Sequence, residues 1–213
     1  MTDMDLQLPL YAKTLLLAYD TEQRKLIRKP HLSIAVRAAI LAELVETGHL
    51  TDTPTGPTVT HGSRPPDAFL AGILDDLTGS PQRSWRACVR RHRSAALKWA
   101  RDDLFARGIL DHHGSAATAV HEAAIRHLHG HLATVLRASP QQRVDREDSA
   151  LLGLAGAARL LHRHVSLRET RLHRERIRAL TDHGGTVVVE ARKAIRRRRA
   201  AMVSSAIAGS HGG

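Results

Sequence analysis

The chain has little cysteine, few aromatic residues and no long apolar run, and each shortage excludes a class of protein. Cys88 is the only cysteine among 213 residues, so no intramolecular disulfide can form. Aromatic residues make up 3% of the chain, which argues against recognition of single strands by base stacking. No apolar run approaches the roughly 20 residues of a membrane-spanning helix, and no segment has the pattern of a signal peptide. We therefore expect a cytoplasmic protein whose membrane contact, where it occurs, is peripheral.

Motifs that carry catalysis or hold metals are also missing. The sequence has no glycine-rich phosphate loop, nucleophile elbow or paired-carboxylate motif, and nothing around Cys88 has the pattern of a catalytic thiol. His127 and His131 have the i, i+4 spacing of a zinc pair, but no further ligand completes a set of three or four. We expect no enzyme, no cofactor and no metal.

Positive charge is the strongest feature that the chain does have. It contains 32 Lys and Arg against 21 Asp and Glu, for a formal net charge of +11. Residues 166–200 hold eleven basic and four acidic residues, and so carry most of the excess. The basic residues of this stretch are Arg168, Arg171, Arg174, Arg176, Arg178, Arg192, Lys193 and Arg196 to Arg199. A clustered excess of this kind predicts an anionic partner.

The stretch from His31 to Gly48 predicts the central helix of the fold. Between Leu32 and Val45 only Arg37 and Glu43 are charged, so a helix here is apolar around most of its circumference, as a helix packed on several sides must be. Ser33 is its expected N-cap, and Gly48 its expected left-handed end.

A short repeat follows this helix and returns sixty residues later. Residues 44–50 and 104–110 share the pattern Leu-x-x-x-Gly-x-Leu, which predicts a helix, a glycine stop and an extended segment that opens a hairpin. Most other segments have helical periodicity. We expect a mainly α fold: one helical domain over residues 1–208, with short β-hairpins after the Gly-x-Leu repeats, and a disordered tail over residues 209–213.

Arg37 is the unusual residue of the central helix. It shares a face with apolar side chains and cannot reach Glu43, which lies six residues on and on another side. Two interpretations remain open. Arg37 either extends along its own stem to pair with a carboxylate elsewhere in the chain, or it binds an anion from a rigid scaffold, since guanidinium suits bidentate recognition of phosphate.

The segment from Val187 to Ile207 predicts a basic amphipathic helix. Its valine end can pack on the domain while Arg196, Arg197, Arg198 and Arg199 face anionic headgroups. The alternative is a solvated basic helix without a role in attachment. Four consecutive arginines span most of a helical circumference, so the segment cannot lie flat in lipid along its whole length.

A succession of segments resembles the Golgi phosphoprotein 3 family, in its compact bacterial form. The segments are Leu8-Pro-Leu10, Thr14-Leu-Leu-Leu17 with Asp20, Val36-Arg-Ala-Ala-Ile-Leu-Ala-Glu-Leu44, Gly48-His-Leu50, Ser84-Trp85 and Leu104-Phe-Ala-Arg-Gly-Ile-Leu110. Order and spacing match through residue 110, and beyond it only the helical outline does. The resemblance implies a helical domain on cytoplasmic membrane faces that, in eukaryotic relatives, holds the headgroup of phosphatidylinositol 4-phosphate in a basic pocket.

The resemblance also implies where such a pocket would lie. The family's arginine on the core helix matches Arg37, its pocket tryptophan falls at Arg28, and its two other arginines fall at Ser94 and Leu97. Nearby basic residues can substitute for these two. The expected headgroup-binding residues are Arg37, Arg28, Arg93, Lys98 and Arg101. The family's protruding apolar hairpin is at most residues 111–119 here, too short and too polar to insert deeply.

Two functions from different classes follow. The first is a peripheral membrane protein that binds anionic phospholipid headgroups through a basic pocket, with a membrane-protein client as a further partner. The alternative is a nucleic-acid-binding protein, because a helix followed by Gly-x-Leu and a hairpin also resembles a winged helix and the net charge suits phosphate backbones. A structural or adaptor role for the helical second half is a third hypothesis.

Overall fold

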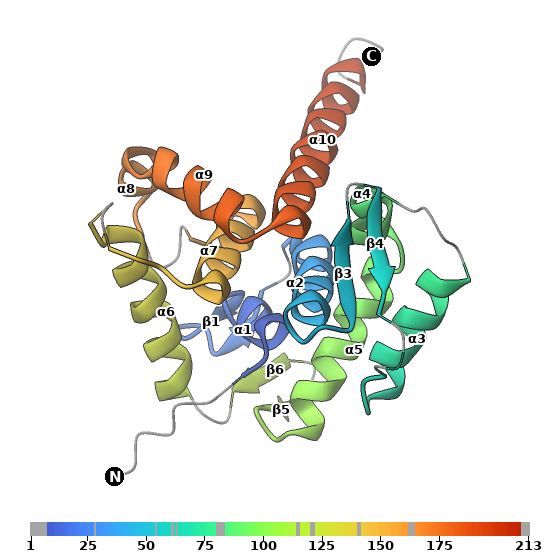
Figure 1. The fold of residues 1–213 in the computed structure, drawn as a ribbon. Helices are drawn as coiled ribbons and strands as arrows, with labels where there is room; N and C mark the ends of the chain where they lie inside the picture. The colour runs from blue at the N-terminus through green and yellow to red at the C-terminus, as the bar shows by residue number, and fades with distance from the viewer. Residues whose placement is uncertain are drawn as a thin grey trace.

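The computed structural model describes residues 8–27, 29–53, 55–60, 62, 64–79, 84–113, 116–119, 122–139, 142–161 and 165–209. The helices are α1 (Leu10–Leu16), α2 (Leu32–Glu46), α3 (Ala68–Thr78), α4 (Trp85–Arg90), α5 (Arg93–Ala106), α6 (Glu122–Arg137), α7 (Arg146–Ala158), α8 (Leu167–Leu172), α9 (Arg174–His183) and α10 (Thr186–Gly209). The strands pair as antiparallel hairpins: β1 (Tyr19–Asp20) with β2 (Lys25–Leu26), β3 (Leu50–Thr53) with β4 (Gly56–Val59), and β5 (Leu110–His113) with β6 (Ala116–Ala119). The expected mainly α fold is confirmed (Figure 1).

Helix α2 lies at the centre of the fold, as its apolar circumference predicts. It packs against α1, α4, α5, α7 and α10, and Ile40, Leu41 and Leu44 are all buried. The expected N-cap was wrong, because the helix already begins at Leu32 and no side chain caps it. The backbone N–H groups of residues 34 and 35 both donate to the His31 carbonyl, so the chain is helical before it reaches Ser33.

Each Gly-x-Leu repeat ends a helix and opens a hairpin, as expected. Gly48 has φ of 77° and Gly108 has φ of 66°, a left-handed conformation that glycine adopts at no steric cost. In each repeat the leucine two residues after the glycine is buried and begins a strand: Leu50 begins β3, and Leu110 begins β5. In the two hairpins Leu50 is opposite Val59, and Leu110 is opposite Ala119. The repeat is therefore a local device that turns the chain out of a helix and keeps the hairpin attached to the core.

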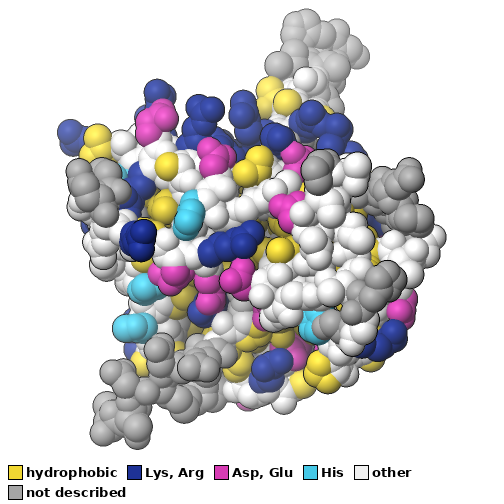
Figure 2. All heavy atoms as spheres, in the orientation of Figure 1, with side chains coloured by type: hydrophobic (Ala, Val, Ile, Leu, Met, Phe, Trp, Pro, Cys, Tyr) yellow, Lys and Arg dark blue, Asp and Glu magenta, His cyan; other side chains and the backbone are white. Residues whose placement is uncertain are grey.

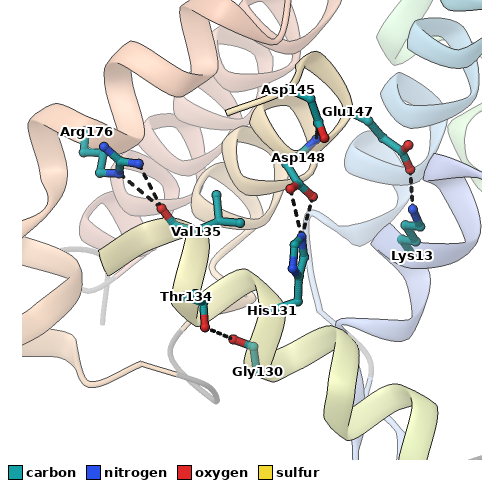
Figure 3. Close-up of polar contacts among 9 residues, drawn as sticks. All are labelled: Lys13, Gly130, His131, Thr134, Val135, Asp145, Glu147, Asp148 and Arg176. Atoms are coloured by element: carbon teal, nitrogen blue, oxygen red, sulfur yellow. Dashed lines mark hydrogen bonds and ion pairs between the residues drawn. The ribbon is translucent and has the colours of Figure 1, made fainter. Parts of the chain in front are cut away.

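Polar contacts join α6, α7 and α9 on one side of the fold (Figure 3). His131 of α6 has its Nε2 atom 2.8 Å from Oδ2 of Asp148 in α7. Arg176 of α9 donates from Nη2 to the Val135 carbonyl at 3.1 Å, near the carboxyl end of α6, where a cation also interacts favourably with the helix dipole. His131, one of the two histidines with zinc-pair spacing, thus faces a carboxylate of the neighbouring helix.

The first half of α10 packs on the body of the protein. Val187, Val188 and Ile195 are buried, so the valine end docks as expected. Gly209 is the last residue of α10, and the remainder of the expected disordered tail, residues 210–213, lies outside the described residues. Over the described ranges, no helix combines the length and the apolar character that crossing a bilayer would require.

We predict that Gly153→Ala lowers the free energy of unfolding by about 1–3 kcal/mol, the usual cost of overpacking. A Cβ atom at Gly153 would lie 2.8 Å from Cγ1 of Val188 and 3.0 Å from Cα of Thr181, so the backbone of α9 must shift. Urea denaturation measures the effect. Gly130→Ala in α6 is the matched control: nothing lies within 4 Å of its Cβ position, and the gain in helix propensity should raise the free energy of unfolding by about 0.5–1 kcal/mol. Equal stabilisation by both changes would contradict the close approach of α7 to α9 and α10.

Candidate functional site

A small cavity lined mainly by arginine lies between α4, α10 and the first turns of α2 and α5. Its volume is about 260 Å³. Its lining residues are Ile34, Arg86, Arg90, Arg93, Ala194, Arg197, Arg198 and Ala201. The five arginines are the only charged side chains among the described residues that line it. We call this cavity the arginine pocket.

Helix α4 supplies two of the arginines because its opposite side is buried in the core. Trp85, Cys88 and Val89 are almost fully buried, and the Trp85 indole Nε1 donates to Asp52 of β3 at 2.6 Å. Arg86 and Arg90 are exposed and lie one helical turn apart. The docking of α4 therefore fixes both guanidinium groups on its outer side.

The other three arginines come from α5 and α10. Arg93 is the first residue of α5, after a corner at which His92 adopts φ of 50°, and its Nη1 donates to the Arg90 carbonyl at 3.3 Å. On α10, Ile195 is buried and the helix packs against α4. Arg197 and Arg198 follow within one turn and line the opposite wall.

The positive charges of the arginine pocket oppose one another. The pKa of Arg93 is lowered, first by burial and then by the guanidinium groups of Arg198 and Arg90. A lowered pKa means that the protonated form of Arg93 is held in an unfavourable field. An anion in the pocket would relieve this repulsion, because it would be attracted to all of these guanidinium groups.

The run of four arginines in α10 divides into three environments. Arg197 and Arg198 line the arginine pocket, whereas Arg196 is exposed and is not among its lining residues. Arg199 turns toward α7 and donates from Nη2 to the Ala157 carbonyl at 2.8 Å, at the carboxyl end of that helix. Burial and Arg159 lower the pKa of Arg199. The four residues therefore have different opportunities to meet an anion.

Arg37 lies inside the protein. Its residue is 1% exposed, and its Nε donates to the Cys88 carbonyl of α4 at a long 3.4 Å. Burial lowers the pKa of Arg37 to about 10, the nearby Asp76 opposes that shift, and Arg91 reinforces it. Its Nη2 atom is buried without a hydrogen-bond partner. Arg37 is therefore close to α4, but it is not among the residues that line the arginine pocket.

The other expected headgroup residues have separate positions. Arg93 lines the arginine pocket. Lys98 pairs with Asp102 one turn along α5, at 3.0 Å, and Arg101 is half-buried with its Nε atom unpartnered. Arg28 lies outside the described residues. Of the expected set, the structure thus places Arg93 beside the arginines of α10.

Arg86 and Arg90 were not singled out from the sequence. A signal was present, because both belong to a short basic stretch and alternate with the buried positions of α4. That pattern predicts a polar helix face, but it does not say which other helix lies opposite.

A second cavity, of about 660 Å³, has a different character. Its charged lining residues are Lys13, Glu43, Glu46, Asp52, Arg146 and Glu147. Several are already paired: Lys13 with Glu147 (Figure 3) and Arg146 with Glu46 at 3.6 Å. Carboxylates outnumber cations here, so this cavity is the poorer candidate for an anion. In the described part of the chain, no group of three or more His, Cys, Asp or Glu side chains could hold a metal ion.

Glu43 is the carboxyl group of this cavity that burial perturbs most. Its pKa is raised from 4.5 to about 7, first by burial and then by Glu147, although hydrogen bonds from the backbone N–H groups of Tyr11 and Leu10 act to lower it. Its Oε2 atom is buried without a partner. Below neutral pH the folded protein therefore holds a proton on Glu43 that the unfolded chain releases more readily.

We predict that Glu43→Gln makes stability less dependent on pH. With the folded pKa raised, the stabilising contribution of the protonated carboxyl is complete below about pH 4.5 and disappears as the pH rises through about 7. The slope for one proton is at most about 1.4 kcal/mol per pH unit. The free energy of unfolding, measured from pH 4.5 to 8, should fall less steeply for the variant, which should be more stable than the unsubstituted protein at pH 8. Parallel curves would contradict the raised pKa.

Comparison with known proteins identifies the family of the chain. No curated protein sequence matches it significantly. The family model of Golgi phosphoprotein 3 (GPP34) matches residues 10–198, a span that runs from the start of α1 to Arg198 and contains all five arginines of the pocket. Because this match covers most of the 213 residues, the chain belongs to the Golgi phosphoprotein 3 (GPP34) family.

Proposed function

We propose that this protein is a peripheral membrane protein that binds anionic phospholipid headgroups in the arginine pocket. One observation carries the proposal: five arginines from α4, α5 and α10 line one cavity, and no carboxylate is among its described lining residues. Membership of the Golgi phosphoprotein 3 family supports lipid binding rather than catalysis. In this account Arg93, Arg197 and Arg198, all expected from the sequence to bind lipid, act in one site together with Arg86 and Arg90.

Phosphate is the anion that suits this pocket. A guanidinium group donates two parallel hydrogen bonds to phosphate oxygens, and a phosphomonoester carries up to two negative charges near neutral pH. The volume of about 260 Å³ lies below the range of roughly 300–1,000 Å³ for sites that enclose drug-sized ligands. The pocket therefore suits the phosphate end of a headgroup, with the lipid chains outside.

Charge rather than stacking should determine which lipid binds. The described lining residues include no aromatic side chain, and the family's pocket tryptophan falls at Arg28 in this sequence. A headgroup that exposes a monoester, such as phosphatidylinositol 4-phosphate or phosphatidic acid, should bind more tightly than phosphatidylserine. The inositol ring should add less affinity than the phosphate does.

Arg37 has a supporting role in this proposal. Its hydrogen bond reaches the carbonyl of Cys88, on the buried side of α4, whereas Arg86 and Arg90 on the same helix line the pocket. Arg37 therefore helps to hold α4 in place, and its own charge adds to the positive potential of this region.

We predict that Arg197→Gln and Arg198→Gln together weaken binding to vesicles that contain phosphatidylinositol 4-phosphate or phosphatidic acid. Each arginine that meets an anionic surface contributes about 1 kcal/mol, or roughly fivefold in affinity, and the loss should shrink as salt rises. Co-sedimentation with vesicles of matched total charge measures the effect. Neutral phosphatidylcholine vesicles give the background.

Arg196→Gln is the matched control, because it removes the same charge from the same helix at an exposed position that does not line the pocket. It should lower affinity less than either single pocket substitution, because Arg196 would feel only the general attraction of the surface, whereas Arg197 and Arg198 would also contact the phosphate in the pocket. Equal losses at all three positions would indicate diffuse attraction instead of a pocket. A duplex DNA arm at the same salt tests the alternative function: tighter binding to DNA than to the phosphomonoester vesicles would overturn the proposal.

A further inference from the structure

The second half of α10 projects from the body of the protein (Figure 1). Val188, Ala191 and Ile195 are buried against the other helices. Every residue from Ala200 to Ser204 is exposed, and five consecutive residues cover more than one full turn of a helix. The helix therefore leaves the domain close to residue 200 and continues to Gly209.

This projecting end is uncharged and partly apolar. Residues 200–209 contain no Asp, Glu, Lys or Arg. Met202 is 50% exposed and Val203 is 60% exposed, two of the few large apolar side chains at the surface of the described residues. The hydroxyl group of Ser204 donates to the Ala200 carbonyl at 3.1 Å, so this polar atom is already paired within the helix. If this helix end moved from water into an apolar layer, the Ser204 hydroxyl would therefore keep its hydrogen bond.

A cluster of arginines precedes the point at which the helix leaves the domain. Arg196, Arg197 and Arg198 are exposed, and only the half-buried Arg199 separates them from the exposed run that begins at Ala200. Figure 2 shows that Lys and Arg side chains gather along the edge of the body from which α10 projects. Six residues separate Arg197 from Val203, which is about 9 Å along a helix. Helices that bind a membrane surface bury their apolar side chains about 5–10 Å deep, at the boundary of headgroups and acyl chains.

We propose that the end of α10 enters the boundary between headgroups and acyl chains of an anionic membrane. Met202 and Val203 are buried there, while Arg196, Arg197 and Arg198 stay at the level of the lipid phosphates. This inference rests on the proposed function and adds to it an orientation: the edge of the body around the base of α10 faces the membrane, and the helix end anchors it. In this orientation the arginine pocket lies next to the lipid headgroups.

Charge favours an anionic bilayer, and not a second copy of the chain, as the partner of the projecting end of α10. Two α10 ends packed side by side in parallel would bring two sets of three arginines together. In an antiparallel pair the neutral end of one helix would lie against the arginines of the other, without an opposite charge. In an anionic membrane, the apolar acyl chains would surround Met202 and Val203, and the negatively charged headgroups would lie beside the arginines that precede them.

A fluorophore at position 203 tests the insertion in the full chain. The environment-sensitive dye NBD is attached to Val203→Cys, and Cys88, which is buried, is not expected to react in the folded protein. The control is the same dye on Ala106→Cys, an exposed position at the end of α5. With phosphatidic acid vesicles that contain brominated acyl chains, we expect a blue shift and at least twofold quenching at position 203, and neither at position 106. Quenching at 106 and not at 203 would overturn the orientation.

An uncharged polar substitution separates this inference from the proposed function. The double variant Met202→Gln with Val203→Gln should bind phosphatidic acid vesicles about tenfold more weakly, because two apolar side chains are lost and each amide must leave water. It should bind soluble inositol 1,4-bisphosphate unchanged, because it leaves all five arginines of the pocket in place and adds no charge beside them. Both side chains are exposed, so the fold should persist.

The outcomes distinguish the two ideas. If the double variant binds vesicles as tightly as the unsubstituted chain, while Arg197→Gln and Arg198→Gln still weaken binding, the insertion is wrong and the proposed function stands. If the unsubstituted chain binds neither vesicles nor the soluble headgroup, both are wrong. A blue shift at position 203 that needs no vesicles and grows with protein concentration would identify a second copy as the occupant and overturn the insertion.

Discussion

The packing of the apolar side of α10 onto α2 and α4 holds five arginines around one cavity. Val188, Ala191 and Ile195 are fully buried, and burial of a valine or isoleucine side chain contributes about 1.5–3 kcal/mol. Two like charges at about 4 Å repel by about 1 kcal/mol in water, and by more where water is partly excluded. The apolar contacts of α10 can therefore exceed the repulsion between its arginines and those of α4 and α5. The positive field of the pocket is thus fixed before any ligand arrives, and a ligand does not have to assemble it.

Central burial of α2 makes this arrangement possible. The helix packs on α4, α5 and α10, the three elements that supply the arginines, so each of them has one fixed position relative to the others. Arg37 extends from α2 to the Cys88 carbonyl of α4. The Nη2 atom of Arg37 has no hydrogen-bond partner although the residue is 1% exposed, and leaving a buried polar group unpaired costs free energy. This unpaired group lies where α2 meets α4, the helix that forms one wall of the pocket.

The elements of the fold that follow local rules could be predicted from the sequence. The apolar circumference of residues 32–45 identified α2, and the glycines at 48 and 108 identified two hairpins because a left-handed residue ends a helix in a defined way. Ser33 was misplaced as a cap because capping signals leave helix boundaries uncertain by a residue or two.

The candidate site depended on contacts between distant segments, which periodicity does not determine. Helical spacing assigns Arg86 and Arg90 to the outer side of α4, but it does not show that α10 lies opposite them. Four consecutive arginines of α10 look equivalent in the sequence. Only the packing directs Arg199 to the Ala157 carbonyl and leaves Arg196 exposed. The family resemblance led to Arg93, which lines the arginine pocket, because it carries information about tertiary structure that the residue pattern does not.

The most direct test of this account is calorimetric titration of the protein with soluble inositol 1,4-bisphosphate, the headgroup of phosphatidylinositol 4-phosphate without its acyl chains. We expect one site per chain, an affinity that falls when Arg93 and Arg197 are both replaced by glutamine, and nearly unchanged binding when Arg196 is replaced instead. A soluble ligand removes every contribution from the membrane surface, so the titration reports on the arginine pocket alone. Equal affinity for the pocket variant and the Arg196 variant would contradict binding of the headgroup in the arginine pocket.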